Sequence, residues 1–166
     1  ADLSHSILTD VKLDHLCSNN KNCQPIDLTG ANLVDVDLSS IDLSNTILTN
    51  ANLENAMLEN VHIINATLDG ANLTNANLRG TLLAYSNLSK AKLTGADMTN
   101  VVLPEAKLTN ANLENAILEN ANLIDANLDS ANLTNANLRK SLLVDANLSN
   151  TILTGADLSN AVLSGA

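Results

Sequence analysis

The amino-acid sequence predicts a solenoid, a chain wound into stacked coils, and two regularities carry that prediction. From position 28 to position 163 every fifth residue is Leu, except Ile63 and Met98, so one apolar phase runs through 28 positions without a slip. Two residues before each of these positions stands a small or β-branched residue, most often Ala. Self-similarity at a fixed short period is the signature of a repeat architecture.

A period of five fits neither of the regular secondary structures. In a helix of 3.6 residues per turn, successive Leu residues would rotate around the surface. In a strand of period two, every other Leu would face the wrong side. Asn and Gly crowd the position two after the Leu, as at Asn55 and Gly70, and these residues tolerate positive φ at turns. The pattern therefore indicates a chain that bends after every five residues and turns Leu and the small residue inward.

The repeat is interrupted once, near the N-terminus. Residues 1–15 read as three repeats. Residues 16–25 then have no Leu in the phase of the repeat and are rich in Asn. This segment is ten residues long, so the phase of five survives it, and it is either a looped-out insertion or two degenerate repeats. Its Asn residues and Pro25 favour a loop. We expect a single domain over 1–166 with a non-repeat loop at 16–25.

From Ile26 onward the motif is A-[N/D]-L-x-[N/G], with clear copies ANLEN at 51–55, ANLTN at 71–75 and GADLSN at 155–160. In tandem this motif resembles the pentapeptide-repeat family, including secreted and thylakoid-lumen members. The resemblance implies an all-β fold, a right-handed quadrilateral β-helix with four pentapeptides in each coil and Leu and Ala filling the interior.

A longer internal repeat supports a coil of twenty residues. Residues 51–103 align with 111–163 without gaps, with 35 of 53 positions identical, and the offset of 60 equals three such coils. Residues 26–166 would then make about seven coils, a rod of roughly 34 Å at the spacing of stacked strands. In this register Glu59 stacks on Arg79 and Glu119 on Arg139, which predicts two cross-strand ion pairs.

Composition and charge narrow the function classes. The net charge is −10, and nucleic acid is bound by clustered Lys and Arg, so ordinary nucleic-acid binding is excluded. A basic protein partner, mimicry of nucleic acid, or simply an acidic soluble surface remain. No apolar run approaches the ~18 residues of a membrane span, so no membrane insertion is expected. No signal peptide is visible, and the chain begins inside a repeat, as a processed protein would.

No catalytic motif stands out of the repeat. Ser, Asp and Asn recur throughout because turns and solvated faces favour them, and a filled solenoid offers no deep pocket. We therefore expect no enzyme activity, no cofactor and no metal site.

Cys17 and Cys23 are the two Cys residues, and both lie in the non-repeat segment. They form a disulfide, bind zinc with His15 and His5, or remain free thiols. Five residues separate them, whereas zinc pairs are usually spaced by two to four, so a disulfide is favoured. A disulfide implies an oxidising compartment, the thylakoid lumen or the periplasm, with the cytoplasm as the alternative.

One predicted side of the solenoid is apolar. The pentapeptides that begin at 61, 81, 101, 121, 141 and 161 stack in coils of twenty, and their outward positions predict an interaction face. That face comprises His62, Ile64, Leu82, Ala84, Val102, Pro104, Ile124, Leu142, Val144 and Val162. Contiguous apolar patches tend to mark contact sites, although drift on a flat sheet would also produce one.

The sequence thus predicts a non-enzymatic structural or protein-interaction module that uses flat solenoid faces, with a protein partner of unknown identity. The alternative, implied by the resemblance alone, is a DNA-mimicking acidic inhibitor of a type II topoisomerase. We also expect weak self-association through the C-terminal coil, around Leu153, Leu158 and Leu163, because a bare last coil exposes core side chains.

Overall fold

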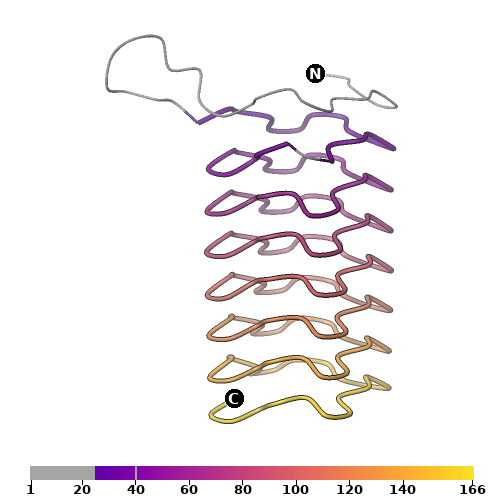
Figure 1. Ribbon diagram of the computed structural model, residues 1–166, viewed down its shortest axis with the longest axis vertical. Coiled ribbons are helices and arrows are strands. Elements are labelled where there is room, and N and C mark those ends of the chain that lie inside the picture. The colour runs from indigo at the N-terminus through magenta and orange to yellow at the C-terminus, as the bar shows by residue number, and fades with distance from the viewer. Residues whose placement is uncertain (1–24, 40) are drawn as a thin grey trace.

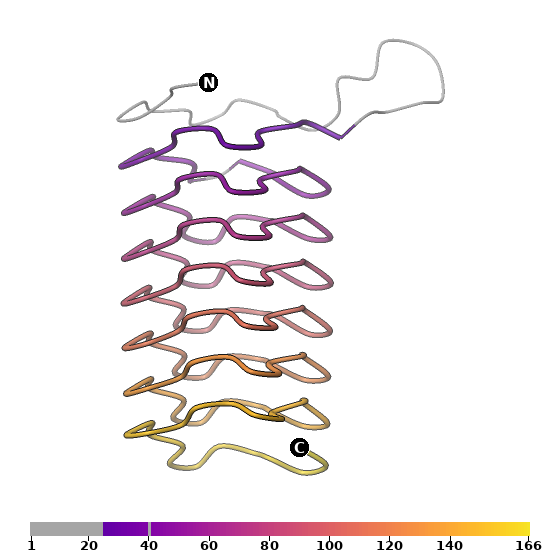
Figure 2. The same ribbon diagram turned by 180° about the vertical axis from the view of Figure 1, so that it is seen from behind.

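In the computed structural model, residues 25–39 and 41–166 are described, and they wind into a stack of coils that follow one another along a single axis (Figure 1). Seen from behind, the colour passes in chain order from one end of the stack to the other (Figure 2). These residues contain no helix and no continuous strand. Single parallel bridges join the coils instead. Each bridge links the residue before a Leu position to the residue twenty positions further along, as from Asn52 to Asn72 and from Asn72 to Lys92.

The chain turns at every fifth residue, at the position two after the Leu. Every described residue there has a positive φ, from 53° at Asp35 to 78° at Gly165. The next amide closes the turn by donating back to the Leu carbonyl, as Ala51 N does to Leu48 O at 3.0 Å. The predicted turns are confirmed, and they explain why Asn and Gly dominate this position, since both tolerate the left-handed region.

Four such segments make one coil, so the solenoid has four sides. We number the sides by the pentapeptides that build them. The first side begins at 26, the second at 31, the third at 36 and the fourth at 41, and each recurs every twenty residues.

The Asn and Asp residues that precede the Leu have a structural role beyond the solvated polar face that the repeat predicts. Their side-chain oxygen accepts the amide of the residue two further on, as Asn72 Oδ1 accepts Thr74 N at 3.2 Å. Such Asx turns fix the path of the backbone as it leaves each side. The Asn amide also reaches the neighbouring coil, where Asn72 Nδ2 donates to Asn52 Oδ1 at 2.9 Å.

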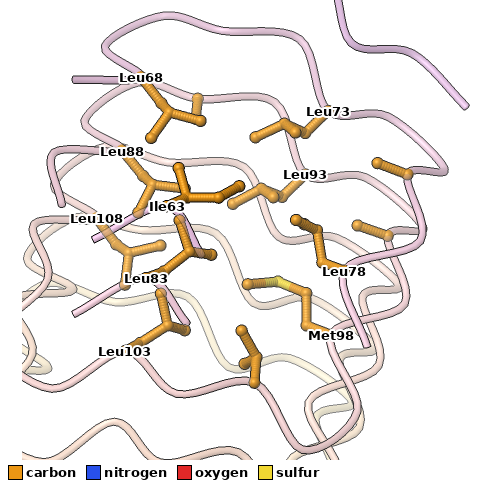
Figure 3. Packing of buried hydrophobic residues seen from close by; sticks show 14 of the residues in the cluster. Ile63, Leu68, Leu73, Leu78, Leu83, Leu88, Leu93, Met98, Leu103 and Leu108 are labelled. Carbon is orange, nitrogen blue, oxygen red and sulfur yellow. The ribbon is translucent and has the colours of Figure 1, made fainter. Parts of the chain in front are cut away.

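Leu and Ala form the interior, as predicted. Stacked columns run along the axis, for example Ile63, Leu83 and Leu103 in one and Leu78 with Met98 in another (Figure 3). All of these side chains are fully buried. Burial of a Leu contributes about 1.5–3 kcal/mol before the loss of chain entropy, so the columns supply the main stabilisation.

A few inward positions hold Ser or Thr instead of Ala, and each hydroxyl is satisfied. Thr81 Oγ1 donates to Leu58 O at 2.7 Å, and Ser86 Oγ donates to Ile63 O at 2.5 Å. A buried hydroxyl without a partner would be costly. These positions therefore tolerate a polar side chain because a backbone carbonyl stands within reach.

Gly70 shows that the turn columns are crowded as well as left-handed. Its φ is +66°, and a Cβ placed there would collide with Asn50 Oδ1 of the neighbouring coil. At Gly30, with φ +64°, a Cβ would meet nothing within 4 Å. The two glycines therefore face the same backbone constraint, and one of them faces a packing constraint as well.

Candidate functional site

The outward side chains of the fourth side lie in two columns. The first column is linked by successive bridges from His62 to Leu82, Val102, Asn122, Leu142 and Val162. The second column stands two residues further along each segment and contains Ile64, Ala84, Pro104, Ile124 and Val144. The structure thus brings every residue of the predicted interaction face onto one side, and we call this surface the apolar face.

All ten side chains of the apolar face reach the surface. Leu142 is 38% exposed and Val162 is 41% exposed, His62 is also exposed, and the others are partly buried against their neighbours. Elsewhere large apolar side chains are isolated. Met57 and Ile117 share a column on the third side, for example, but Asn77 and Asp97 stand between them.

A charged column that was not predicted borders the apolar face. Glu105, Asp125 and Asp145 occupy the turn that follows Pro104, Ile124 and Val144 respectively. All three are exposed, with φ of 55–56°, and none has an ion pair or a side-chain hydrogen bond among the described residues. No Lys or Arg occurs on the described part of the fourth side. We call these three residues the acidic corner.

Tyr85 stands in the same turn column, one coil before Glu105. It is the chain's single aromatic residue and is 57% exposed. Its φ is 61°, in a region that a bulky residue rarely adopts. The signal that could have revealed both Tyr85 and the acidic corner was present: the Asn or Gly of the motif is replaced there.

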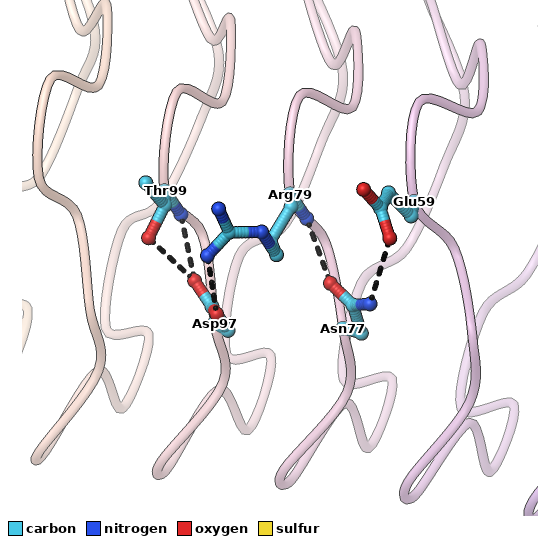
Figure 4. Close-up of polar contacts among 5 residues, drawn as sticks. All are labelled: Glu59, Asn77, Arg79, Asp97 and Thr99. Carbon is cyan, nitrogen blue, oxygen red and sulfur yellow. Dashed lines mark hydrogen bonds and ion pairs between the residues drawn. The ribbon is translucent and has the colours of Figure 1, made fainter.

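The third side carries ion pairs, but not the ones that the register predicted. The expected pairs of Glu59 with Arg79 and of Glu119 with Arg139 are wrong. Arg79 NH1 instead lies 3.0 Å from Asp97 Oδ2 of the following coil (Figure 4). Glu59 accepts a hydrogen bond from Asn77 Nδ2 at 3.4 Å.

The duplicated coils repeat the arrangement, with Arg139 3.6 Å from Asp157 and with Lys140 as the partner of Glu119 at 3.4 Å. Stacking on the same column thus does not fix the partner of a long side chain. The Arg extends to the next coil, where an Asp already lies fixed by its own turn.

Three donors hold the Asp97 carboxylate of this side. Burial raises its pKa, but hydrogen bonds from the Thr99 hydroxyl and amide, together with the Arg79 guanidinium, outweigh burial and hold the pKa below its ordinary value. Thr99 Oγ1 lies 2.6 Å and Thr99 N lies 3.0 Å from Asp97 Oδ1. All three donors favour the ionised form.

An open hollow of about 590 Å³ lies at the end of the last coil, and its lining includes Asp145, Ser149 and Leu163. A shallow hollow of about 250 Å³ lies between Ile41, Asp42, Asn60 and His62, and its lining contains no Ser or Cys. No group of three or more His, Cys, Asp or Glu side chains suited to a metal ion occurs in 25–39 and 41–166. The same part of the chain contains no helix long and apolar enough to cross a membrane.

Two predicted features lie outside the described residues or at the end of the stack of coils. Cys17, Cys23 and the non-repeat segment, apart from Pro25, fall outside the described residues. In the final coil Leu153 and Leu158 are partly buried and Leu163 is 42% exposed. The predicted disulfide and the predicted self-association therefore stay predictions.

Comparison with known proteins agrees with the four-sided fold of the repeats. The pentapeptide-repeat family matches in eight copies, over residues 26–63, 62–100, 106–143 and 141–166. The chain belongs to the pentapeptide-repeat family, whose fold is a right-handed quadrilateral β-helix. The predicted resemblance is confirmed. No curated protein matches the chain.

Among solved structures, the chain is similar to HetL from the cyanobacterium Nostoc sp. strain PCC 7120, a pentapeptide-repeat protein involved in regulation of heterocyst differentiation. The identity is 32%, the match covers 98% of this chain and 74% of HetL, and the TM-score is 0.52. A pentapeptide-repeat protein of the Arabidopsis thaliana thylakoid lumen is 28% identical, with coverage of 69% and 66% and a TM-score of 0.25. The plasmid-mediated fluoroquinolone resistance protein QnrB1 is 19% identical, with coverage of 86% and 76% and a TM-score of 0.47.

Proposed function

We propose that this protein is a non-enzymatic protein-interaction module that binds a protein partner on the apolar face. The observation that carries the proposal is the gathering of apolar outward side chains on one side of an otherwise polar solenoid. A contiguous apolar surface costs solubility, and on soluble proteins such patches tend to be contact sites.

Tyr85 supports the proposal that a partner binds on this side of the solenoid. A Tyr in the left-handed region costs of order 1 kcal/mol, and Asn would occupy this turn at lower cost. Exposed Tyr side chains are enriched in protein interfaces, where they supply large contact area at small entropic cost. A strained and exposed aromatic beside the apolar face is consistent with selection for contact and not for stability.

The alternative of DNA mimicry is less well supported by the charge density. We infer seven coils over 26–166, a rod of about 34 Å, and duplex DNA of that length carries about 20 charges. Residues 26–166 hold 15 carboxylates against six Lys and Arg side chains, a net charge of −9. Three of those basic side chains are paired with carboxylates on the third side. The rod therefore presents less than half of the charge of the duplex that it would imitate.

The test is a capture experiment from the native host with Leu82→Asp and Leu142→Asp combined. Asp suits this position, because Asp97 and Asp157 occupy the equivalent one and accept the amide two residues on. The double variant should fold and lose its partner. It contradicts the proposal if it retains every partner of the wild type.

The matched control is Thr67→Asp with Asn127→Asp. These two residues occupy the same position in the same two coils, but on the first side, and the pair changes the charge by the same amount. The control should keep the partner. Loss of binding in both double variants would mean that added negative charge, and not the apolar face, governs the interaction.

For the compartment, we propose a disulfide between Cys17 and Cys23 and therefore an oxidising location, the thylakoid lumen or the periplasm. The support is the sequence itself, in which both Cys residues lie in one short non-repeat segment. Alkylation of protein purified without reductant from its native compartment should label neither thiol. Labelling of both would overturn the disulfide and favour the cytoplasm.

A further inference from the structure

We propose that the partner seated on the apolar face is an amphipathic α-helix that lies along the solenoid axis and carries Lys or Arg along the edge that meets the acidic corner. This inference rests on the proposed function and names the chemistry of the partner. Three observations carry it: the state of the backbone on this side, the arrangement of the apolar columns, and the unpaired carboxylates that border them.

The backbone groups that bridge the coils of the fourth side are already engaged. Leu83 N donates to Val102 O at 2.7 Å, Val102 N donates to Thr81 O at 3.0 Å, and Leu103 N donates to Asn122 O at 2.8 Å. No free strand edge runs along this side, so a partner cannot add itself as a further strand. An extended peptide pressed onto the apolar face would bury its own amides and carbonyls without partners. A helix satisfies its backbone internally and avoids that cost.

The dimensions of the apolar face suit a helix. From Ile64 to Val144 the second column rises by four coils, about 19 Å at the spacing of stacked strands, which matches about 13 helical residues. One helical turn rises 5.4 Å, close to the roughly 4.8 Å between coils. Apolar side chains spaced three and four residues apart on the helix can therefore meet successive coils.

The acidic corner decides the charge of that helix. Glu105, Asp125 and Asp145 stand on successive coils, so they span two coil spacings, about 10 Å, or six to seven residues of a helix. Their carboxylates are exposed and unpaired among the described residues, and the described part of the fourth side has no Lys or Arg to offset them. Three Lys or Arg side chains at spacings of three to four residues would face all three carboxylates. An acidic helix would be repelled.

The experiment uses two synthetic helical peptides of about 14 residues, long enough to cover the face. Both carry Leu along one stripe at spacings of three and four. One has three Lys residues along an edge of the stripe, and the other has Glu at those three places. A helix can lie in either direction on the face, so a single basic edge suffices. Binding to the full chain is measured by fluorescence anisotropy at low salt and at about 0.5 M NaCl, where screening is strong.

The wild type should bind the Lys peptide at least tenfold more tightly than the Glu peptide, and high salt should narrow that difference. The triple variant Glu105→Asn, Asp125→Asn and Asp145→Asn should bind the Lys peptide roughly tenfold more weakly. Asn is the commonest residue at this turn in the chain, so this variant keeps the fold.

The control Glu54→Gln, Asp69→Asn and Glu114→Gln removes three carboxylates from the first and second sides and should change the affinity less than twofold. Three outcomes would overturn the helix: neither peptide binds, the acidic-corner variant keeps wild-type affinity, or Leu82→Asp with Leu142→Asp binds the Lys peptide unchanged. The proposed function fails separately, if native partners still bind the Leu82→Asp, Leu142→Asp variant as they bind the wild type. A native partner lost on that variant, with no binding of the Lys peptide, would leave the proposed function standing and refute the helix.

Discussion

Leu113→Ala should lower the free energy of unfolding by about 4 kcal/mol, because the stacked coils cannot close around the space that it leaves. Leu113 is fully buried, between Leu93 and Leu133 in its column. Removal of three carbon atoms costs about 2.4 kcal/mol in transfer. A residual cavity of about 60 Å³ adds about 1.4 kcal/mol.

The cavity term depends on how rigidly the neighbouring coils are held. Leu113 N donates to Asn132 O at 2.7 Å, and on the other side Leu93 N donates to Asn112 O, also at 2.7 Å. The coils above and below are thus fixed at backbone hydrogen-bond distance, and the site can relax little. At Leu153, which is only partly buried, the same change should cost about 1–2 kcal/mol.

Urea unfolding followed by far-ultraviolet circular dichroism measures both losses. Thr109→Ser is a suitable control, since Thr109 makes no side-chain hydrogen bond among the described residues, and its effect should stay within about 0.5 kcal/mol. If Leu113→Ala costs no more than Leu153→Ala, the coils do relax toward one another and the argument from a clamped backbone is wrong.

Three further outcomes follow from the structure. Gly30→Ala should lower the free energy of unfolding by about 1 kcal/mol because its backbone is left-handed, and Gly70→Ala should lower it by about 1 kcal/mol more because of the clash with Asn50. Thermal denaturation measures both losses, and equal losses would show that the Asn50 side chain turns away freely. Thr99→Val should raise the pKa of Asp97, measured by NMR titration of the carboxyl. Because that pKa lies below its unfolded value near 3.9, the stabilisation is complete above that pH and is lost as pH falls through the folded pKa; an unchanged pKa in the variant would contradict this assignment. Arg139→Gln should change stability by less than about 1 kcal/mol, and a larger loss would mean that this exposed pair is more than a surface contact.

Much of the fold could be predicted because each pentapeptide repeats the same local constraint. Leu and Ala must face inward wherever they recur, and a residue such as Asn55 sits where positive φ is required. The position of the apolar face followed from the same count, since Leu82 and Leu142 stand three coils apart. Prediction of such features requires only the repeat period, which can be counted in the sequence.

The side-chain partners could not be predicted in the same way. Arg79 stands on the column of Glu59, yet it reaches Asp97, because a long side chain chooses among several carboxylates at similar distance. The role of Asn72 in closing its own turn was open to prediction from its spacing to Thr74, but turn chemistry of this kind competes with the simpler view of a solvated polar face.

The two periods of this molecule have a consequence for how such a chain can change over generations. The interior repeats every five residues, whereas each surface column repeats every twenty. A deletion or insertion of five residues would leave every Leu in phase and the core intact. It would also rotate all later sides by a quarter turn, so that Leu142 no longer followed Leu82 on one side. The free energy of unfolding would therefore change little, and selection against such an event would come from the loss of a bound partner. Insertions of twenty residues would keep both the phase of the core and the order of the surface columns. They would lengthen the contact surface without altering its pattern.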